Sequence, residues 1–103
     1  MFNAQEIRDE IVDYIVASEI AFSDWYVGTT SDPVTRLFID HNVKKEEFWI
    51  YKDAGSEDCA RAIEEFIVNT YKTKSRSSIE DSTKGNKAAQ NVYAYIITEK
   101  TRQ

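Results

Sequence analysis

The sequence predicts a small α+β fold, in which about three helices pack on a mainly antiparallel three-stranded sheet. Segments with apolar residues at helical spacing alternate with short aromatic and β-branched runs, which predicts the order α-β-α-β-α-β. The expected helices cover about 4–18, 33–41 and 57–71, and the expected strands 25–30, 48–51 and 91–98. At 103 residues, 42% hydrophobic and 30% charged, and without repeats or linkers, residues 1–103 are expected to form a single domain.

The first helix is predicted from its start signal and its apolar period. Asn3 followed by Glu6 resembles a capping box, in which the two residues satisfy each other's free amide groups. The apolar residues that then share one helical face are Ile7, Ile11, Tyr14 and Ile15.

The segment that begins at Trp25 reads as a strand followed directly by a helix. Trp25-Tyr26-Val27-Gly28-Thr29-Thr30 is aromatic and β-branched, as is typical of strands. Ser31 or Asp32 can cap the helix, and Pro33 suits its first position. The residues expected on the buried face of this helix are Val34, Leu37, Phe38 and His41.

The second half of the chain shows a strand, a helix, a loop and a strand. Phe48-Trp49-Ile50-Tyr51 is almost entirely apolar, which predicts a central strand. Ser56 can cap the next helix, whose expected buried side comprises Cys59, Ala60, Ile63, Phe66, Ile67 and Thr70. Residues 72–90 are rich in Ser, Thr, Lys and Gly and are expected to form a long loop before the last strand.

Charge is distributed unevenly along the chain, whose net charge is −5. Residues 1–24 contain six acidic residues against Arg8, so this end is expected to meet a basic protein partner if it meets any. Residues 72–87 carry a basic excess that could face DNA or RNA. The candidate nucleic-acid contacts in that stretch are Lys72, Lys74 and Arg76.

The single cysteine and the hydropathy of the chain indicate the cellular compartment that we expect. Cys59 is the single cysteine, which excludes an internal disulfide and a cysteine-based zinc site. The first residues show no secretory signal, and no apolar run is long enough to span a membrane. The sequence therefore predicts a cytoplasmic protein that does not enter membranes.

One stretch carries a recognisable pattern. Tyr26, Gly28, Asp32-Pro33, Arg36 and His41-Asn42 run together as YVGTTSDPVTRLFIDHN, which resembles the YIG strand and following helix of GIY-YIG nucleases. The strand FWIYKDAG and the helix with Ala60-Arg61-Ala62-Ile63-Glu64 also resemble parts of that family, so the likeness covers about 25–71. An extra N-terminal helix and a C-terminal strand then flank a GIY-YIG-like core.

The resemblance implies metal-dependent cleavage of a nucleic-acid phosphodiester. It implies that Tyr26 helps deprotonate the attacking water, that Arg36 binds the phosphate and that Glu64 holds the metal ion. These roles agree with the chemistry of the side chains, because a guanidinium gives paired hydrogen bonds to phosphate oxygens. One carboxylate plus waters suits Mg²⁺ or Mn²⁺, and Glu64 flanks the apolar face while Glu65 points more to solvent.

The first tyrosine strand of the family is missing from its usual place. Tyr14 precedes Tyr26 at a suitable spacing, but the capping and the apolar period place it on a helix. We expect the C-terminal strand to take the missing position in the sheet, so that Tyr93 or Tyr95 stands near Tyr26. This hypothesis requires residues 91–98 to neighbour residues 25–29.

Simpler roles exist for each candidate residue. Tyr26 can be a packed strand residue, and His41, the single histidine, can be a helix-end packing residue. Arg36 can pair with Asp40, and Glu64 can pair with a lysine. The possible functions are accordingly a nuclease, a catalytically inactive GIY-YIG-like binding module, or an acidic protein-interaction domain.

Overall fold

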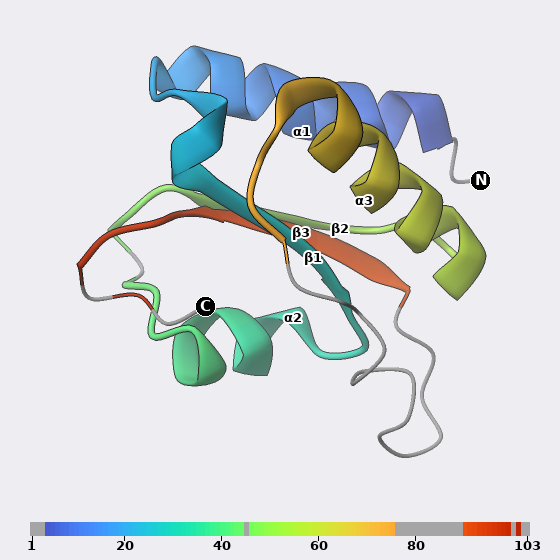
Figure 1. The fold of residues 1–103 in the computed structure, drawn as a ribbon. Coiled ribbons are helices and arrows are strands. Elements are labelled where there is room, and N and C mark those ends of the chain that lie inside the picture. Colours follow the sequence, from blue (N-terminus) through green and yellow to red (C-terminus); the bar gives the residue numbers. More distant parts are fainter. Residues whose placement is uncertain (1–3, 45, 76–89, 100, 102–103) are drawn as a thin grey trace.

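Three strands form one antiparallel sheet that carries helices on both faces (Figure 1). The computed structural model describes residues 4–44, 46–75, 90–99 and 101. The elements in chain order are α1 (Ala4–Ser18), η1 (Phe22–Asp24), β1 (Trp25–Thr30), α2 (Pro33–Thr35), η2 (Arg36–Asp40), β2 (Trp49–Asp53), α3 (Glu57–Tyr71) and β3 (Asn91–Ile96). Helices α1 and α3 cover one face, and α2 with η2 covers the other. The predicted α+β fold and its order of elements are confirmed.

The C-terminal strand β3 is the middle strand of the sheet, in the order β1-β3-β2. It pairs with β1 so that Tyr26 lies opposite Tyr95 and Gly28 opposite Tyr93. The prediction that β3 neighbours β1 is therefore confirmed. The prediction that the strand at 48–51 is central is wrong, because β2 lies at the edge and Tyr51 is 37% exposed.

Helices α1 and α3 form from the periods that the sequence shows. Helix α1 buries Ile7, Ile11 and Ile15, and α3 buries Ala60, Ile63, Glu64 and Ile67. The hydroxyl of Ser56 accepts from the Cys59 amide and caps α3, as predicted. At the other end of α3, Lys72 takes the left-handed conformation with φ of 64°.

Three residues expected on buried helix faces are exposed. Val34 is 50% exposed because it lies in the first turn of α2, next to the turn that leaves the sheet. Phe66 is 39% exposed, since its ring lies at the surface beneath the guanidinium of Arg8. Thr70 is also exposed, because the buried stripe of α3 is narrower than predicted and follows positions 60, 63 and 67.

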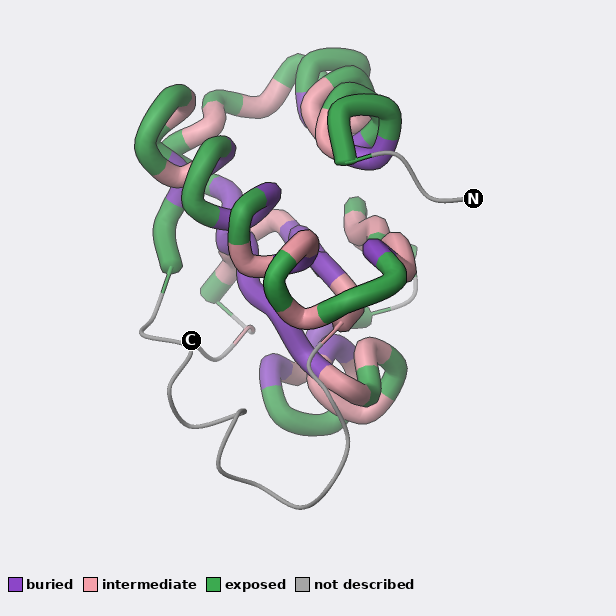
Figure 2. The backbone as a smooth tube through the Cα atoms, turned by 90° about the vertical axis from the view of Figure 1, so that its right-hand side faces the viewer, coloured by how far each residue is buried: buried purple, intermediate pink, exposed green. Residues whose placement is uncertain are grey.

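Side-chain alternation along the strands divides the buried residues into two cores. On the α1 and α3 face, Trp25, Val27, Val92 and Ala94 pack against the helix isoleucines. On the α2 face, the core comprises Tyr26, Leu37, Val43, Tyr93 and Tyr95. Figure 2 shows the buried residues on the inward sides of the helices and along the strands, where they belong to β1 and β3. The second core contains two of the predicted site residues, Tyr26 and Tyr93, together with Tyr95.

Candidate functional site

Gly28 of β1 allows a tyrosine from the neighbouring strand to cross it. A Cβ atom at Gly28 would lie 2.7 Å from the hydroxyl oxygen of Tyr93 and 2.8 Å from its Cζ atom. Such distances are shorter than a carbon can approach these atoms, so any larger residue would displace the Tyr93 ring. The glycine of the YVG motif thus creates the space for a tyrosine that lies 65 residues later in the chain.

His41 joins two tyrosine hydroxyls of β3. Its Nε2 lies 2.8 Å from the hydroxyl of Tyr93, and its Nδ1 lies 2.9 Å from the hydroxyl of Tyr95. A neutral imidazole has one donor and one acceptor nitrogen, so one tyrosine donates to His41 and the other accepts from it. The turn η2 places His41 here, because the His41 amide donates to the Arg36 carbonyl across a wide helical turn.

Tyr26 completes this group of rings, which we call the tyrosine–histidine cluster: Tyr26, His41, Tyr93 and Tyr95. The Tyr26 ring stacks on Tyr95 with centroids 5.1 Å apart and lies 5.0 Å from the ring of His41. All four residues are buried, with between 0 and 4% of their surface exposed. The structure therefore brings Tyr26, His41 and Tyr93 together.

Arg36 lies beside the cluster and is its link to the surface. Its side chain is 19% exposed and its Nε lies 3.7 Å from a carboxylate oxygen of Asp40, the pairing expected at this spacing. Burial raises the pKa of the Tyr93 hydroxyl far above its ordinary value, with a further rise from Tyr26, while the Arg36 charge opposes the rise. Tyr93 is consequently a neutral hydrogen-bonding group at neutral pH.

Glu64 belongs to the opposite helix layer. Its carboxylate accepts a hydrogen bond of 2.8 Å from the hydroxyl of Ser75, and only 6% of its surface is exposed. Burial raises the pKa of Glu64, and the Ser75 hydrogen bond opposes that rise. Because α3 covers the face of the sheet away from α2, the structure does not place Glu64 in the tyrosine–histidine cluster.

The basic candidates follow α3 along the outer edge of β1. The backbone of Lys74 bonds to Trp25 and Val27, and its ammonium donates to the Ser23 carbonyl at 2.9 Å. Lys72 is the exposed residue that ends α3. The third candidate, Arg76, lies outside the described residues.

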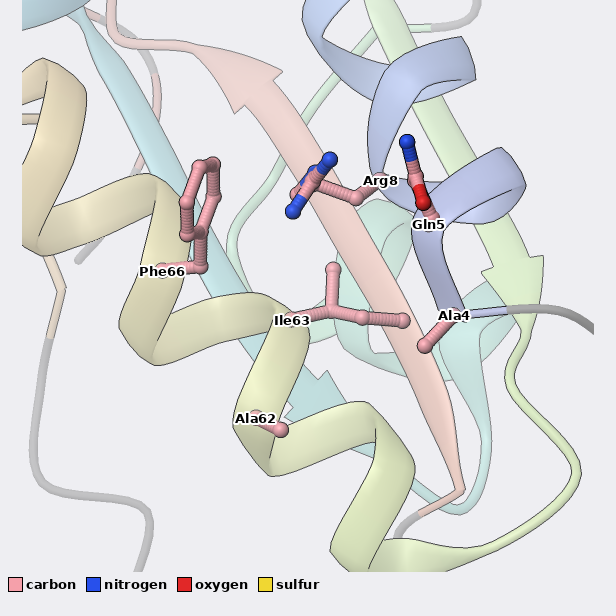
Figure 3. A pocket seen from close by; sticks show the side chains of 6 residues that line it. All are labelled: Ala4, Gln5, Arg8, Ala62, Ile63 and Phe66. Atoms are coloured by element: carbon pink, nitrogen blue, oxygen red, sulfur yellow. The ribbon is translucent and has the colours of Figure 1, made fainter.

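A surface hollow between α1 and α3 lies on the side of the sheet away from the cluster. The side chains of Arg8 and Phe66 point toward each other across it (Figure 3), with the guanidinium carbon 4.2 Å from the ring centroid. The residues that line it are Ala4, Gln5, Arg8, Ala62, Ile63 and Phe66. The polar side chains of the hollow, Gln5 and Arg8, offer no nucleophile or base. We therefore assign the hollow no part in the chemistry of the tyrosine–histidine cluster.

One member of the cluster was predicted only as an alternative, and one partner of a candidate residue was not predicted. Tyr95 was expected only as an alternative to Tyr93, and the structure joins both to His41. The signal for this was the alternation in Tyr93-Ala94-Tyr95, which places both tyrosines on one face of a strand. Ser75, the partner of Glu64, had no signal in the sequence.

Among the described residues, no group of three or more His, Cys, Asp and Glu side chains is placed to hold a metal ion. In the same part of the chain, no helix has the length and apolarity needed to cross a membrane. Comparison with family models, with curated proteins and with solved structures gave no match.

Proposed function

We propose that this chain is a GIY-YIG-like domain that binds the phosphodiester backbone of DNA or RNA at its α2 face. The observation that supports this proposal is the meeting of Tyr26, His41 and Tyr93 beside Arg36. These residues come from two strands and from a helix end, and they match the pattern that the sequence resembles. We propose in addition that the protein acts in the cytoplasm.

Phosphate recognition follows from the chemistry of Arg36 and its surroundings. A guanidinium matches two phosphate oxygens at once, and its interaction strengthens where protein excludes water. Arg36 is mostly covered, and its Nε lies 3.7 Å from a carboxylate oxygen of Asp40, so a phosphate would have to compete with this pairing. The hydroxyl of Tyr93 carries one proton, so it can donate to a phosphate when His41 Nε2 is the donor in their 2.8 Å hydrogen bond.

Lys72 and Lys74 extend this proposed contact along the edge of β1. Cations near a polyanion add affinity without reading its sequence, by releasing condensed counterions. The acidic residues of α1 lie in the layer that covers the opposite face. The nucleic acid would therefore approach from the α2 side and the β1 edge.

Phosphodiester cleavage is a second candidate function, favoured by the hydrogen-bonded chain of hydroxyl and imidazole groups. Cleavage requires a group that takes a proton from the attacking water and one that returns a proton to the leaving oxygen. His41, held by Tyr93 and Tyr95 on its two nitrogens, can accept a proton on one side while it gives one up on the other. Tyr26 and Tyr93 are the hydroxyls that would exchange protons with the substrate.

The expected Mg²⁺ or Mn²⁺ ion does not fit the residues as they are arranged. Glu64 was the expected ligand, but its helix α3 covers the face of the sheet away from α2, and its carboxylate is buried with only 6% of the residue surface exposed. The hydrogen bond from Ser75 already occupies one of its oxygens. These observations favour the inactive binding module over the nuclease.

A binding titration tests the first proposal. We expect a labelled duplex to bind at low salt and the Arg36→Ala variant to bind more weakly, with the slope of log affinity against log salt reduced by about one. Arg61→Ala is the matched control, because Arg61 pairs with Glu57 on α3, away from the α2 face. Equal loss in both variants, or no binding to DNA or RNA in low salt, would contradict the proposal.

A nicking assay on supercoiled DNA with Mg²⁺ or Mn²⁺ tests cleavage separately. Cleavage by this site predicts that Arg36→Ala abolishes nicking and that Tyr93→Phe slows it by about 10²-fold. Tyr71→Phe serves as control, since Tyr71 stacks on Phe22 in the other layer. Nicking that survives Arg36→Ala and Glu64→Gln would come from a contaminant, and binding without nicking identifies an inactive module.

A further inference from the structure

The outer side of β2 presents backbone groups that the sheet does not use. The amide of Ala54 donates to the carbonyl of Gln90 at 2.8 Å, in register with the pairing of β2 and β3. In antiparallel pairs such positions alternate with positions whose N–H and C=O point away from the partner strand. The backbone groups of Tyr51 and Asp53 therefore point outward.

The two edges of the sheet differ in how they are covered. At the β1 edge, the backbone of Lys74 hydrogen-bonds to the outward carbonyl of Trp25 and to the outward amide of Val27. At the β2 edge, the Trp49 amide donates to the Tyr14 hydroxyl at 3.3 Å, which covers one end. Among the described residues, no chain segment pairs with β2 on its outer side. Such an edge is a template for a further strand.

An aromatic surface adjoins this open edge. Tyr51 is 37% exposed, and its ring stacks on Trp49 with centroids 6.1 Å apart and planes 12° apart. Phe38 meets Trp49 edge-on from the α2 face, which holds the pair in place. Faces of aromatic rings attract the cationic groups of lysine and arginine.

Acidic side chains border the same edge from α1. Glu10 forms an ion pair of 2.7 Å with Lys52, which brings one flank of α1 next to β2. Glu6 and Asp13 are exposed and lie four residues before and three residues after Glu10, so they share this flank. With Asp53 on the strand, this set of described residues contains four carboxylates against the ammonium of Lys52.

We infer that β2 receives an extended basic segment of another protein, which adds a fourth strand to the sheet. The outward backbone groups of Tyr51 and Asp53 would supply the hydrogen bonds, and the acidic flank with the Tyr51 ring would select lysine and arginine. A second copy of this chain is disfavoured because two acidic flanks would meet. The inference does not depend on the proposed nucleic-acid function, since it uses the opposite edge of the sheet.

The probe is a short peptide of alternating lysine and valine, offered to the full chain labelled with ¹⁵N. Amide hydrogen exchange of Tyr51 and Asp53 is expected to slow when the peptide binds, because their amides become hydrogen-bonded. A peptide with glutamate in place of lysine is expected not to bind. A lysine peptide methylated on the backbone nitrogens of one edge should also fail to bind, and this control leaves the protein unchanged.

Two matched variants test the backbone contact itself. Tyr51→Pro removes the outward amide without removing a bond to β3, and Tyr51→Thr removes the ring but keeps that amide. We expect the peptide to bind Tyr51→Pro roughly tenfold more weakly than Tyr51→Thr. Glu10→Gln combined with Asp13→Asn should weaken binding and its salt dependence, whereas Glu65→Gln on α3 should leave both unchanged.

Several results would overturn the inference. Equal binding of the methylated and unmethylated peptides would show that the backbone edge is not used. Binding without slowed exchange at Tyr51 and Asp53 would place the peptide elsewhere. Slowed exchange that grows with protein concentration in the absence of peptide would assign the edge to a second copy of the chain.

Discussion

At the scale of single residues, Gly28 and Tyr93 show how a short motif acts through a distant partner. Gly28 lies in a buried strand, where a glycine ordinarily weakens packing. The missing side chain of Gly28 leaves space on the strand, which the Tyr93 ring occupies while its hydroxyl bonds to His41. The glycine is thus part of the tyrosine–histidine cluster, although it carries no side chain.

We expect Gly28→Ala to destabilise the protein by about 1–3 kcal/mol, because the added methyl overpacks a core that cannot expand freely. The Tyr93 ring cannot swing away cheaply, since it is buried and bonded to His41. Chemical denaturation of the variant measures the loss. The same substitution in a Tyr93→Leu background should cost much less, and an equal cost in both backgrounds would contradict the assigned contact.

Glu64 is a buried carboxyl whose raised pKa links stability to pH. Its protonated form is favoured in the folded state, so its contribution is complete below the usual value of 4.5 and is lost as pH rises toward the higher native pKa. Glu64→Gln should therefore match the native chain at low pH and become relatively more stable as pH rises above 4.5.

Denaturation curves collected across pH measure this effect. Glu46→Gln is the control, because Glu46 is exposed, lies outside α3 and should change stability little. A constant difference between Glu64→Gln and the native chain across the range would refute the buried-carboxyl explanation.

At the scale of elements, α3 shows how helix ends are determined locally. Ser56 caps its start through the Cys59 amide, and Glu57 and Asp58 in the first turn favour the positive end of its dipole. At its end, Lys72 adopts the left-handed conformation, which glycine occupies with much less strain. The helix ends at Lys72, although glycine would adopt this backbone conformation with less strain.

We expect Lys72→Gly to stabilise the protein by about 0.5–1 kcal/mol, because it removes the clash of a side chain at positive φ. Lys72→Ala retains the Cβ atom and should give no such gain. Thermal denaturation of the two variants measures the difference. Equal stability of both would mean that the backbone strain at Lys72 is not significant.

At the scale of the whole molecule, β3 ties two cores into one unit. Tyr93 and Tyr95 point into the α2 core, while Val92 and Ala94 point into the core beneath α1 and α3. Each amide of β3 faces either β1 or β2, so this strand is bonded along both sides. Opening the protein at β3 would expose both cores at once.

Native-state hydrogen exchange should therefore find its slowest amides at Tyr93, Ala94 and Tyr95, close to the limit set by global unfolding. In β2 the amide of Lys52 faces β3 and should exchange slowly, whereas the outward amide of Tyr51 should exchange fast in the free protein. Equal rates at Lys52 and Tyr51 would contradict the register of the edge strand.

The local elements could be predicted because each one rests on signals within a few residues. The capped start and apolar period of α3, and the proline that opens α2, lie inside their own segments. The alternation in Tyr93-Ala94-Tyr95 was enough to place two tyrosines on one strand face. The position of β2 was predicted wrongly because an apolar run indicates only that both faces of a strand are covered. A central strand must also have a neighbouring strand on each of its two edges.

The YVG segment and the helix that follows it could be identified from the sequence by itself, together with Tyr26, Arg36 and His41 as residues that would lie near one another. Only the tertiary structure decided that Tyr93 and Tyr95 both bond to His41, that Gly28 makes room for this, and that Glu64 stands in the other helix layer. The physical reason is the range of the interactions. Periods of two and 3.6 residues are local and readable, whereas strand order and the layer that a helix joins depend on contacts between residues far apart in the chain.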